Sequence, residues 1–98
     1  MSENDSGELL DDDGYPTDET LARIRTWPCG DFDGLMAFIN SIWWQKYGWK
    51  EARGYVHMST GGWSGNEDII SALRENRVFW AMFWYSNKRG GHYIFKKR

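Results

Sequence analysis

The feature that most constrains the fold is an uninterrupted apolar run of eight residues, Val78–Tyr85, in a chain of 98 residues. Eight residues rich in aromatic side chains are typical of a central strand. If helices cover both faces of its sheet, the whole run belongs to the core. If they cover one face, half of the run is exposed, and such a patch usually marks an interface.

Two helices are predicted before the first strand. Thr17 is a good N-cap, and the Trp-Pro pair at 27–28 ends the helix that follows it, because a residue before proline resists helical angles. Asp31 or Asp33 caps the second helix, in which apolar residues recur at spacings of three and four to about Gln45.

The rest of the domain alternates between strands and one further helix. Arg53–Thr60 is predicted to be a strand, and Ser64 with Glu67 matches the capping box that opens a helix ending near Asn76. After the apolar run and a glycine-containing turn, His92–Lys96 forms the last strand. The order α-α-β-α-β-β predicts an α+β fold with a three-stranded sheet and helices packed on it.

Charge is divided unevenly along the chain. Residues 1–19 hold eight acidic and no basic side chains, whereas the remainder holds six acidic and all 12 basic ones. Segment 1–14 has only Leu9 and Leu10 as apolar anchors, too few to offset the entropy of ordering it. We therefore expect a disordered acidic N-terminal segment at 1–14 and a single small α+β domain at 15–98.

The sequence shows neither a signal peptide nor an apolar run near 18 residues, so we expect a cytoplasmic protein that does not enter a membrane. Its single cysteine, Cys29, excludes an internal disulfide and is compatible with a reducing compartment.

Catalytic and metal-binding patterns are weak. His57 and His92 lie on predicted strands and could approach each other if those strands are neighbours, but two histidines alone do not make a metal site. Residue types of a hydrolytic triad occur at Ser59, Ser64, His57 and Asp68. Nothing in their spacing brings them together, and no G-x-S-x-G motif is present. We expect no enzymatic activity, no cofactor and no metal.

Protein binding is the leading functional hypothesis. The glycine-rich loop at 60–67 has the parts of a phosphate cradle but lacks a G-K-[ST] motif, and its acidic residues would repel phosphate. It is instead interpreted as a capped turn or as a contact loop that presents Trp63. The candidate residues for contacting a protein partner, or for self-association, are Trp63, Ser64, Asn66, Trp80 and Trp84.

Binding of single-stranded nucleic acid is the alternative. Basic residues gather near the end of the chain beside strand aromatics, and aromatic faces with basic borders can stack unpaired bases. The candidate residues are Lys88, Arg89, Tyr93, Phe95, Lys96 and Lys97. A solvated turn followed by a basic tail explains the same pattern without a ligand.

The stretch from residue 55 to 95 resembles a group of small uncharacterised bacteriophage and prophage proteins. The likeness rests on the TGGWSGNE loop at 60–67 and the RGGHYIF strand at 89–95. It implies a phage or prophage setting and an intracellular location, and it assigns no catalytic residue. With the aromatic and loop surface, this setting leads us to expect a non-enzymatic phage accessory factor that engages a host or phage protein in the host cytoplasm.

Overall fold

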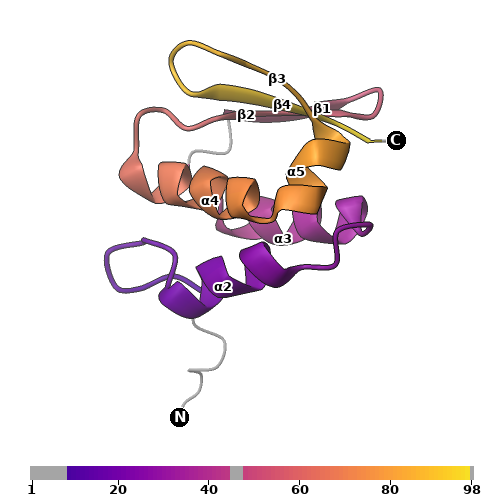
Figure 1. The fold of residues 1–98 in the computed structure, drawn as a ribbon. Helices are drawn as coiled ribbons and strands as arrows, with labels where there is room; N and C mark the ends of the chain where they lie inside the picture. The colour runs from indigo at the N-terminus through magenta and orange to yellow at the C-terminus, as the bar shows by residue number, and fades with distance from the viewer. Residues whose placement is uncertain (1–8, 45–47, 98) are drawn as a thin grey trace.

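A four-stranded antiparallel sheet packs its inner face against helices in the computed structural model, which describes residues 9–44 and 48–97 (Figure 1). The α+β fold class is confirmed, but the sheet has four strands and not three. In chain order the elements are α2 (Asp18–Thr26), α3 (Phe32–Ile42), β1 (Trp49–Ala52), β2 (Tyr55–Ser59), α4 (Ser64–Glu75), α5 (Arg77–Phe83), β3 (Trp84–Lys88) and β4 (His92–Lys96). The strands lie in the order β1-β2-β4-β3.

Strand β1 is the element that the sequence interpretation missed. It is joined to β2 by Arg53 and Gly54, which both have positive φ angles, 54° and 82°. Two positive φ angles in a two-residue connection are typical of the tight hairpin turn that matches the twist of paired strands. The predicted end of the second helix, near Gln45, is too late, because α3 ends at Ile42. Residues 45–47 lie outside the described part of the chain.

Local capping explains where the first two helices begin, as predicted. The backbone N–H of Thr20 donates to the Thr17 hydroxyl at 3.2 Å, and that of Gly34 donates to the Asp31 carboxylate at 3.0 Å. Each bond satisfies one of the backbone donors that a helix leaves unpaired in its first turn. Asn76 ends α4, also as predicted.

The capping box predicted for α4 is wrong. The helix begins at Ser64 itself, Trp63 occupies the N-cap position, and the Ser64 hydroxyl donates to the Tyr15 hydroxyl at 3.2 Å. Thr60 closes the preceding turn, since its side chain accepts from the N–H of Gly62 and its carbonyl accepts from that of Trp63. Because this turn ends at Trp63, α4 begins one residue earlier than it would if Ser64 were its N-cap.

The apolar run Val78–Tyr85 does not form a central strand, so this prediction is also wrong. Most of the run forms α5, and only Trp84 onward belongs to β3. Phe79 and Phe83 are four residues apart and face the core, where their ring centroids lie 6.1 and 4.9 Å from that of Phe32. A run that is apolar at every position has no period, so a buried helix fits it as well as a strand does.

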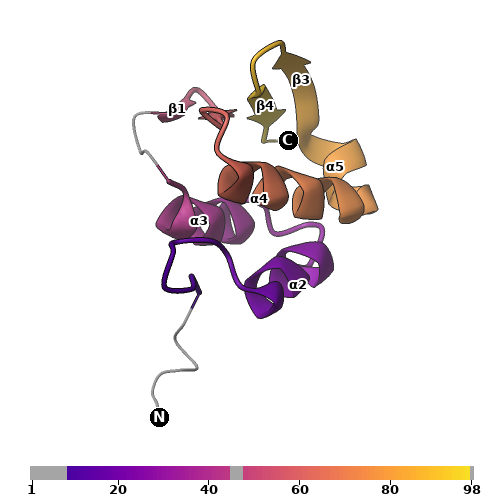
Figure 2. The ribbon, with the colours of Figure 1, turned by 90° about the vertical axis from the view of Figure 1, so that its left-hand side faces the viewer.

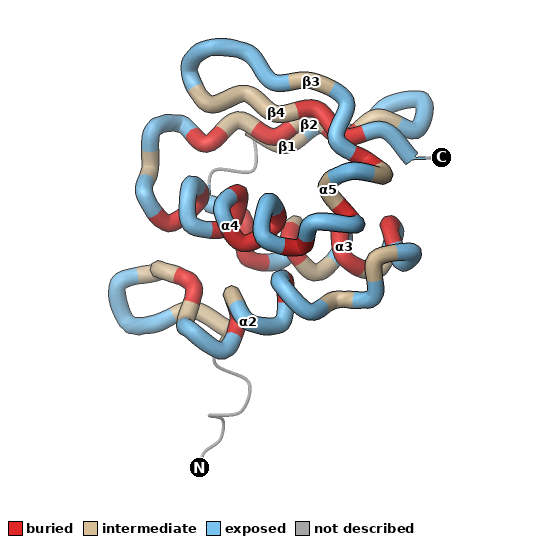
Figure 3. Tube along the Cα trace, viewed as in Figure 1, coloured by how far each residue is buried: buried red, intermediate tan, exposed pale blue. Residues whose placement is uncertain are grey.

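The helices lie on one side of the sheet in both ribbon views (Figures 1 and 2). Helix α4 lies between the sheet and α2, and α3 and α5 complete the layer beneath the strands. Buried residues gather where this helical layer meets the sheet (Figure 3). The opposite side of the sheet has no helix over it among the described residues, and this open face is where the polar and basic strand residues point.

Residues 9–14, which the sequence places in a disordered segment, contact the domain in the structure. The hydroxyl of buried Thr20 donates to the Leu9 carbonyl at 2.7 Å, and the same carbonyl accepts from the N–H of Thr17 at 3.1 Å. Leu9 and Leu10 are partly buried against the core, and Leu10 forms a bridge with Pro16. Residues 1–8, the rest of that expected segment, lie outside the described residues.

Candidate functional site

The strand register divides the side chains of the sheet into two faces. Residues paired directly across antiparallel strands lie on the same face, and successive residues of one strand alternate. Val56 pairs with Phe95 and Met58 with Tyr93, and these face the helices. The open face carries Lys50, Ala52, Tyr55, His57, Ser59, Tyr85, Ser86, Lys88, His92, Ile94 and Lys96.

The charge of the open face is uniformly positive. Lys50 lies across from His57, Lys88 across from His92, and Lys96 across from Tyr55. The residues that the register assigns to this face include no carboxylate within the described part of the chain. Uncompensated lysines on one surface attract anions over a distance of about one Debye length, about 8–10 Å at physiological salt.

Two tyrosines form an aromatic corner at one end of this face. The rings of Tyr55 and Tyr85 meet edge to face with centroids 5.1 Å apart, and the Lys96 ammonium lies 5.4 Å from the Tyr55 ring. Tyr85 reaches this corner because the pairing of β3 with β4 shifts register between Trp84 and Ser86, which leaves Tyr85 without a direct partner. More than half of the Tyr85 side chain is exposed, so its ring is accessible.

A pocket of about 410 Å³ adjoins the aromatic corner. It is lined by Met82, Phe83, Trp84, Tyr85, Lys96 and Lys97. Its wall is therefore largely apolar, with two lysines at its margin.

The two histidines and one serine form a hydrogen-bonded chain on the same face. The Ser59 hydroxyl lies 2.6 Å from Nδ1 of His92, and Nε2 of His92 lies 3.2 Å from Nδ1 of His57. Two combinations of His57 and His92 tautomers satisfy both contacts. In one combination, the Ser59 hydroxyl donates to His92, and His92 donates to His57.

The environment of His92 favours its neutral form. Burial lowers the pKa of the His92 imidazole below its ordinary value of 6.5, and the nearby His57 and Lys88 lower it further. Burial acts because it removes water from the charged form, and the neighbours act because a second positive charge beside an imidazolium is unfavourable.

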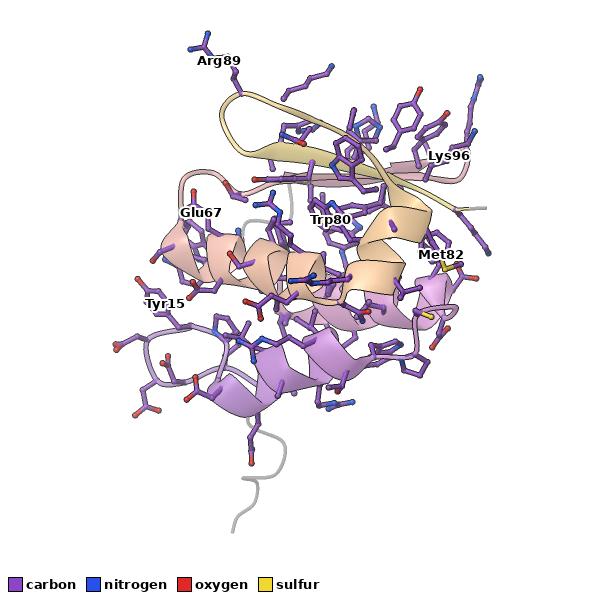
Figure 4. The ribbon with its side chains drawn as sticks, viewed as in Figure 1. Tyr15, Glu67, Trp80, Met82, Arg89 and Lys96 are labelled. Atoms are coloured by element: carbon purple, nitrogen blue, oxygen red, sulfur yellow. The ribbon has the colours of Figure 1, made fainter. Side chains whose placement is uncertain are left out.

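The six residues predicted to contact nucleic acid are separated by the structure. Lys88 and Lys96 lie on the open face, and Lys96 can be seen on the outer side of the sheet in Figure 4. Phe95 is fully buried beneath the sheet, and Tyr93 is half-buried with its ring against Trp80, so neither presents its ring on the open face.

The remaining two basic candidates lie elsewhere. Arg89 is at the tip of the β3–β4 hairpin (Figure 4). The Lys97 ammonium contacts the Asp33 carboxylate at 2.6 Å, next to the helical layer. The aromatic residues of the open face, Tyr55 and Tyr85, are ones that the sequence interpretation did not select.

The residues of the predicted loop contact for a protein partner fall into two groups. Trp63 lies between Tyr15 and Trp44, with ring centroids 4.8 and 5.0 Å away, and this aromatic cluster is partly exposed. Asn66 is fully buried and bonds to backbone atoms of Trp44 and Thr60. It is a structural residue and does not reach the surface.

The two remaining tryptophans predicted to contact a partner lie together at the junction of α5 and β3. The Trp80 side chain extends from α5 toward the inner face of the sheet (Figure 4). The Arg74 guanidinium stacks on its ring. Trp84 stacks on Trp80 and is 39 % exposed, and Val78 nearby in the helix is 57 % exposed.

Metal-binding and membrane-spanning features are not found in the described residues. No group of three or more His, Cys, Asp or Glu side chains there could hold a metal ion. Within the same part of the chain, no helix has the length and apolar character needed to cross a bilayer. No protein-family model, no curated protein and no solved structure matches this chain.

Proposed function

We propose that this protein binds single-stranded nucleic acid across the open face of its sheet. The observation that supports the proposal is the composition of this face, where three lysines surround tyrosine and histidine rings and no carboxylate is found among the described residues. Lysines contact phosphates, and exposed rings stack on unpaired bases. This was the alternative hypothesis from the sequence, now carried by a different set of aromatic residues.

The width of the open face, set by the spacing of its strands, suits an extended single strand of nucleotides. Neighbouring β-strands lie about 4.8 Å apart, so β1, β2, β4 and β3 together offer a platform several nucleotides wide. Lys50 and Lys88 lie on the two outer strands, while Tyr55 and Tyr85 form one end. A duplex hides its base faces, so aromatic rings on an open sheet favour unpaired bases.

The test is fluorescence anisotropy of a labelled 12-residue oligothymidine with the full chain over a series of salt concentrations. We expect affinity to fall linearly on a log–log plot against salt, because bound lysines release counterions. Lys88→Ala should weaken binding and reduce the slope by about 0.7, the value for one phosphate contact in a single strand. Arg25→Ala is the matched control, since its guanidinium contacts Glu75 in the helical layer and not the open face.

Stacking is tested at the aromatic corner. Tyr85→Leu should cost about 1–3 kcal/mol of binding free energy, the range measured when one stacking ring is removed. Trp44→Leu, which removes an exposed ring outside this face, should leave binding unchanged. The proposal fails if the full chain shows no binding at low salt, or if the two variants weaken binding equally.

Protein binding is a second candidate, favoured by the exposed apolar residues at the α5–β3 junction. Val78, Trp84 and Tyr85 are 57, 39 and 53 % exposed, which leaves a hydrophobic surface beside the pocket. Sedimentation over a concentration series tests self-association, with Val78→Asp as the disrupting variant. A phage or prophage setting and a cytoplasmic location stay proposals that rest on the sequence resemblance alone.

A further inference from the structure

Ser59, His92 and His57 form a hydrogen-bonded chain that contacts to phosphates and bases do not require. A nucleophile, a base within hydrogen-bond reach and a third group that orients the base form the arrangement by which proteins activate a hydroxyl. Here the three groups come from adjacent strands β2 and β4, at 2.6 and 3.2 Å. The backbones of paired strands fix these positions, so the groups are held on rigid elements and not on a loop.

We propose that Ser59 is a nucleophile toward phosphodiesters, with His92 as its general base and His57 as a positioning residue. This goes beyond binding, and it departs from the expectation that the protein has no catalytic group. In the tautomer that serves this role, His57 accepts the Nε2 proton of His92. Nδ1 of His92 is then left to accept the proton of the Ser59 hydroxyl.

The reaction balances without a metal or redox partner. Ser59 Oγ attacks phosphorus, its proton moves to Nδ1 of His92, and the Oγ–P bond forms as the bond from phosphorus to the leaving oxygen breaks. His92 returns the proton to that oxygen, which departs as an alcohol. Water then gives a proton to the same nitrogen and attacks phosphorus, and the Oγ–P bond breaks. His92 returns the proton to Ser59 Oγ, which restores the hydroxyl, and the phosphomonoester departs.

The surrounding charge selects the substrate class. Lys88 faces His92 from β3, Lys50 faces His57 from β1, and no carboxylate faces the chain among the described residues. A negatively charged ester is therefore favoured over a neutral one, and the lowered pKa of His92 keeps it able to accept a proton at neutral pH. The substrate class rests on the same lysines as the proposed nucleic-acid binding, whereas the nucleophile does not.

The nucleophile is tested first, with an alkyl fluorophosphonate on the full chain. Attack by Ser59 at phosphorus releases fluoride and leaves an adduct that intact-mass and peptide mass spectrometry locate. We expect a single adduct at Ser59, none in Ser59→Ala, and none at Ser86 in any variant. Ser86 is the internal control, because it lies on the same face outside the hydrogen-bonded chain. An unlabelled wild-type protein, or equal labelling in Ser59→Ala, overturns the proposal.

The roles of the histidines are then separated by labelling rates. His92→Ala should slow labelling by about 10²- to 10⁴-fold, the usual contribution of a general base. His57→Phe should slow it too, but His57→Asn should retain most of the rate, since its amide oxygen can still accept from His92. The rate should fall as pH drops through a midpoint below 6.5, as His92 becomes protonated. Equal rates in His57→Phe and His57→Asn overturn the positioning role.

The substrate class is tested last, with two chromogenic esters. Wild-type protein should release nitrophenol from bis(p-nitrophenyl) phosphate, and Ser59→Ala should not. Release from p-nitrophenyl acetate alone overturns the assignment to phosphodiesters. Labelling at Ser59 in a protein that fails to bind oligothymidine would reject the proposed nucleic-acid function and leave the nucleophile standing, so the two failures can be distinguished.

Discussion

The side-chain amide of Asn66 forms two hydrogen bonds with the backbone of Trp44. It donates to the Trp44 carbonyl at 3.0 Å and accepts from the Trp44 N–H at 3.1 Å. The two residues are 22 positions apart, and Asn66 is fully buried. The same amide also donates to the carbonyl of Thr60 at 3.3 Å. One side chain therefore ties the end of α3 to the turn that precedes α4.

Asn66→Ala should lower the free energy of unfolding by about 2–3 kcal/mol. The change leaves backbone groups of Trp44 and Thr60 without their partner, and a buried polar group left unpaired costs about 1–3 kcal/mol. Urea denaturation followed by tryptophan fluorescence measures the loss. Asn87→Ala is the control, since Asn87 is exposed and should change stability by less than about 0.5 kcal/mol. A normal midpoint for Asn66→Ala would contradict this structural role.

Thr20→Val should loosen the attachment of residues 9–14 to the domain. Valine keeps the shape of the side chain but removes the hydroxyl that donates to the Leu9 carbonyl, so a loss of about 1 kcal/mol is expected. The Thr17 amide, which shares that carbonyl, should exchange its hydrogen faster. Thr26→Val removes an exposed hydroxyl of the same helix and should affect neither measurement.

Ala81→Gln distinguishes the helix α5 from a strand at the same residues. In the helix Ala81 is exposed, so a larger polar side chain should be tolerated with little change in the thermal midpoint. In a strand Ala81 would share a face with Phe79 and Phe83 in the core, and glutamine there would be strongly destabilising. Phe79→Ala, which empties a fully buried position, should cost about 3–5 kcal/mol.

The His92 imidazole should titrate below 6.5 when followed by NMR, because its burial, His57 and Lys88 all disfavour the charged form. Lys88→Gln removes one positive neighbour and should raise the midpoint, whereas Lys97→Gln should not. Since the unfolded chain protonates near 6.5, it binds more protons than the folded chain as pH falls below that value. His92 should therefore add stability above about pH 6.5 that is lost as pH falls through its folded pKa. A midpoint above 6.5 would contradict the assignment.

Features set by neighbouring residues could be predicted from the sequence, and features set by distant pairing could not. Thr17 and Asp31 cap helices through bonds that span three residues, so their signals are local. The alternation of side chains along β4 could also be predicted from the sequence, but which face of β4 the helices cover depends on the whole fold. For that reason Phe95 was chosen as a binding residue although the structure buries it.

The candidate site also depends on contacts between residues that are distant in the chain. His57 and His92 are 35 residues apart in the chain, and their contact exists because β2 pairs with β4 in one register. A shift by one residue would turn His57 toward the helices. The sequence supplied the residue types of this site, and the pairing of the strands supplied the site.

The outer strands of the sheet also decide how this protein can associate. A further strand needs a straight row of unpaired backbone groups, but β1 is only four residues long and carries Lys50 and Glu51, while β3 is interrupted at Tyr85 and ends in Lys88. Short length, charge and a bulge each hinder edge-to-edge addition. Growth into fibrils by strand addition is therefore disfavoured at both rims of the described sheet, which leaves its side chains, and not its backbone edges, as the surface that another molecule could bind.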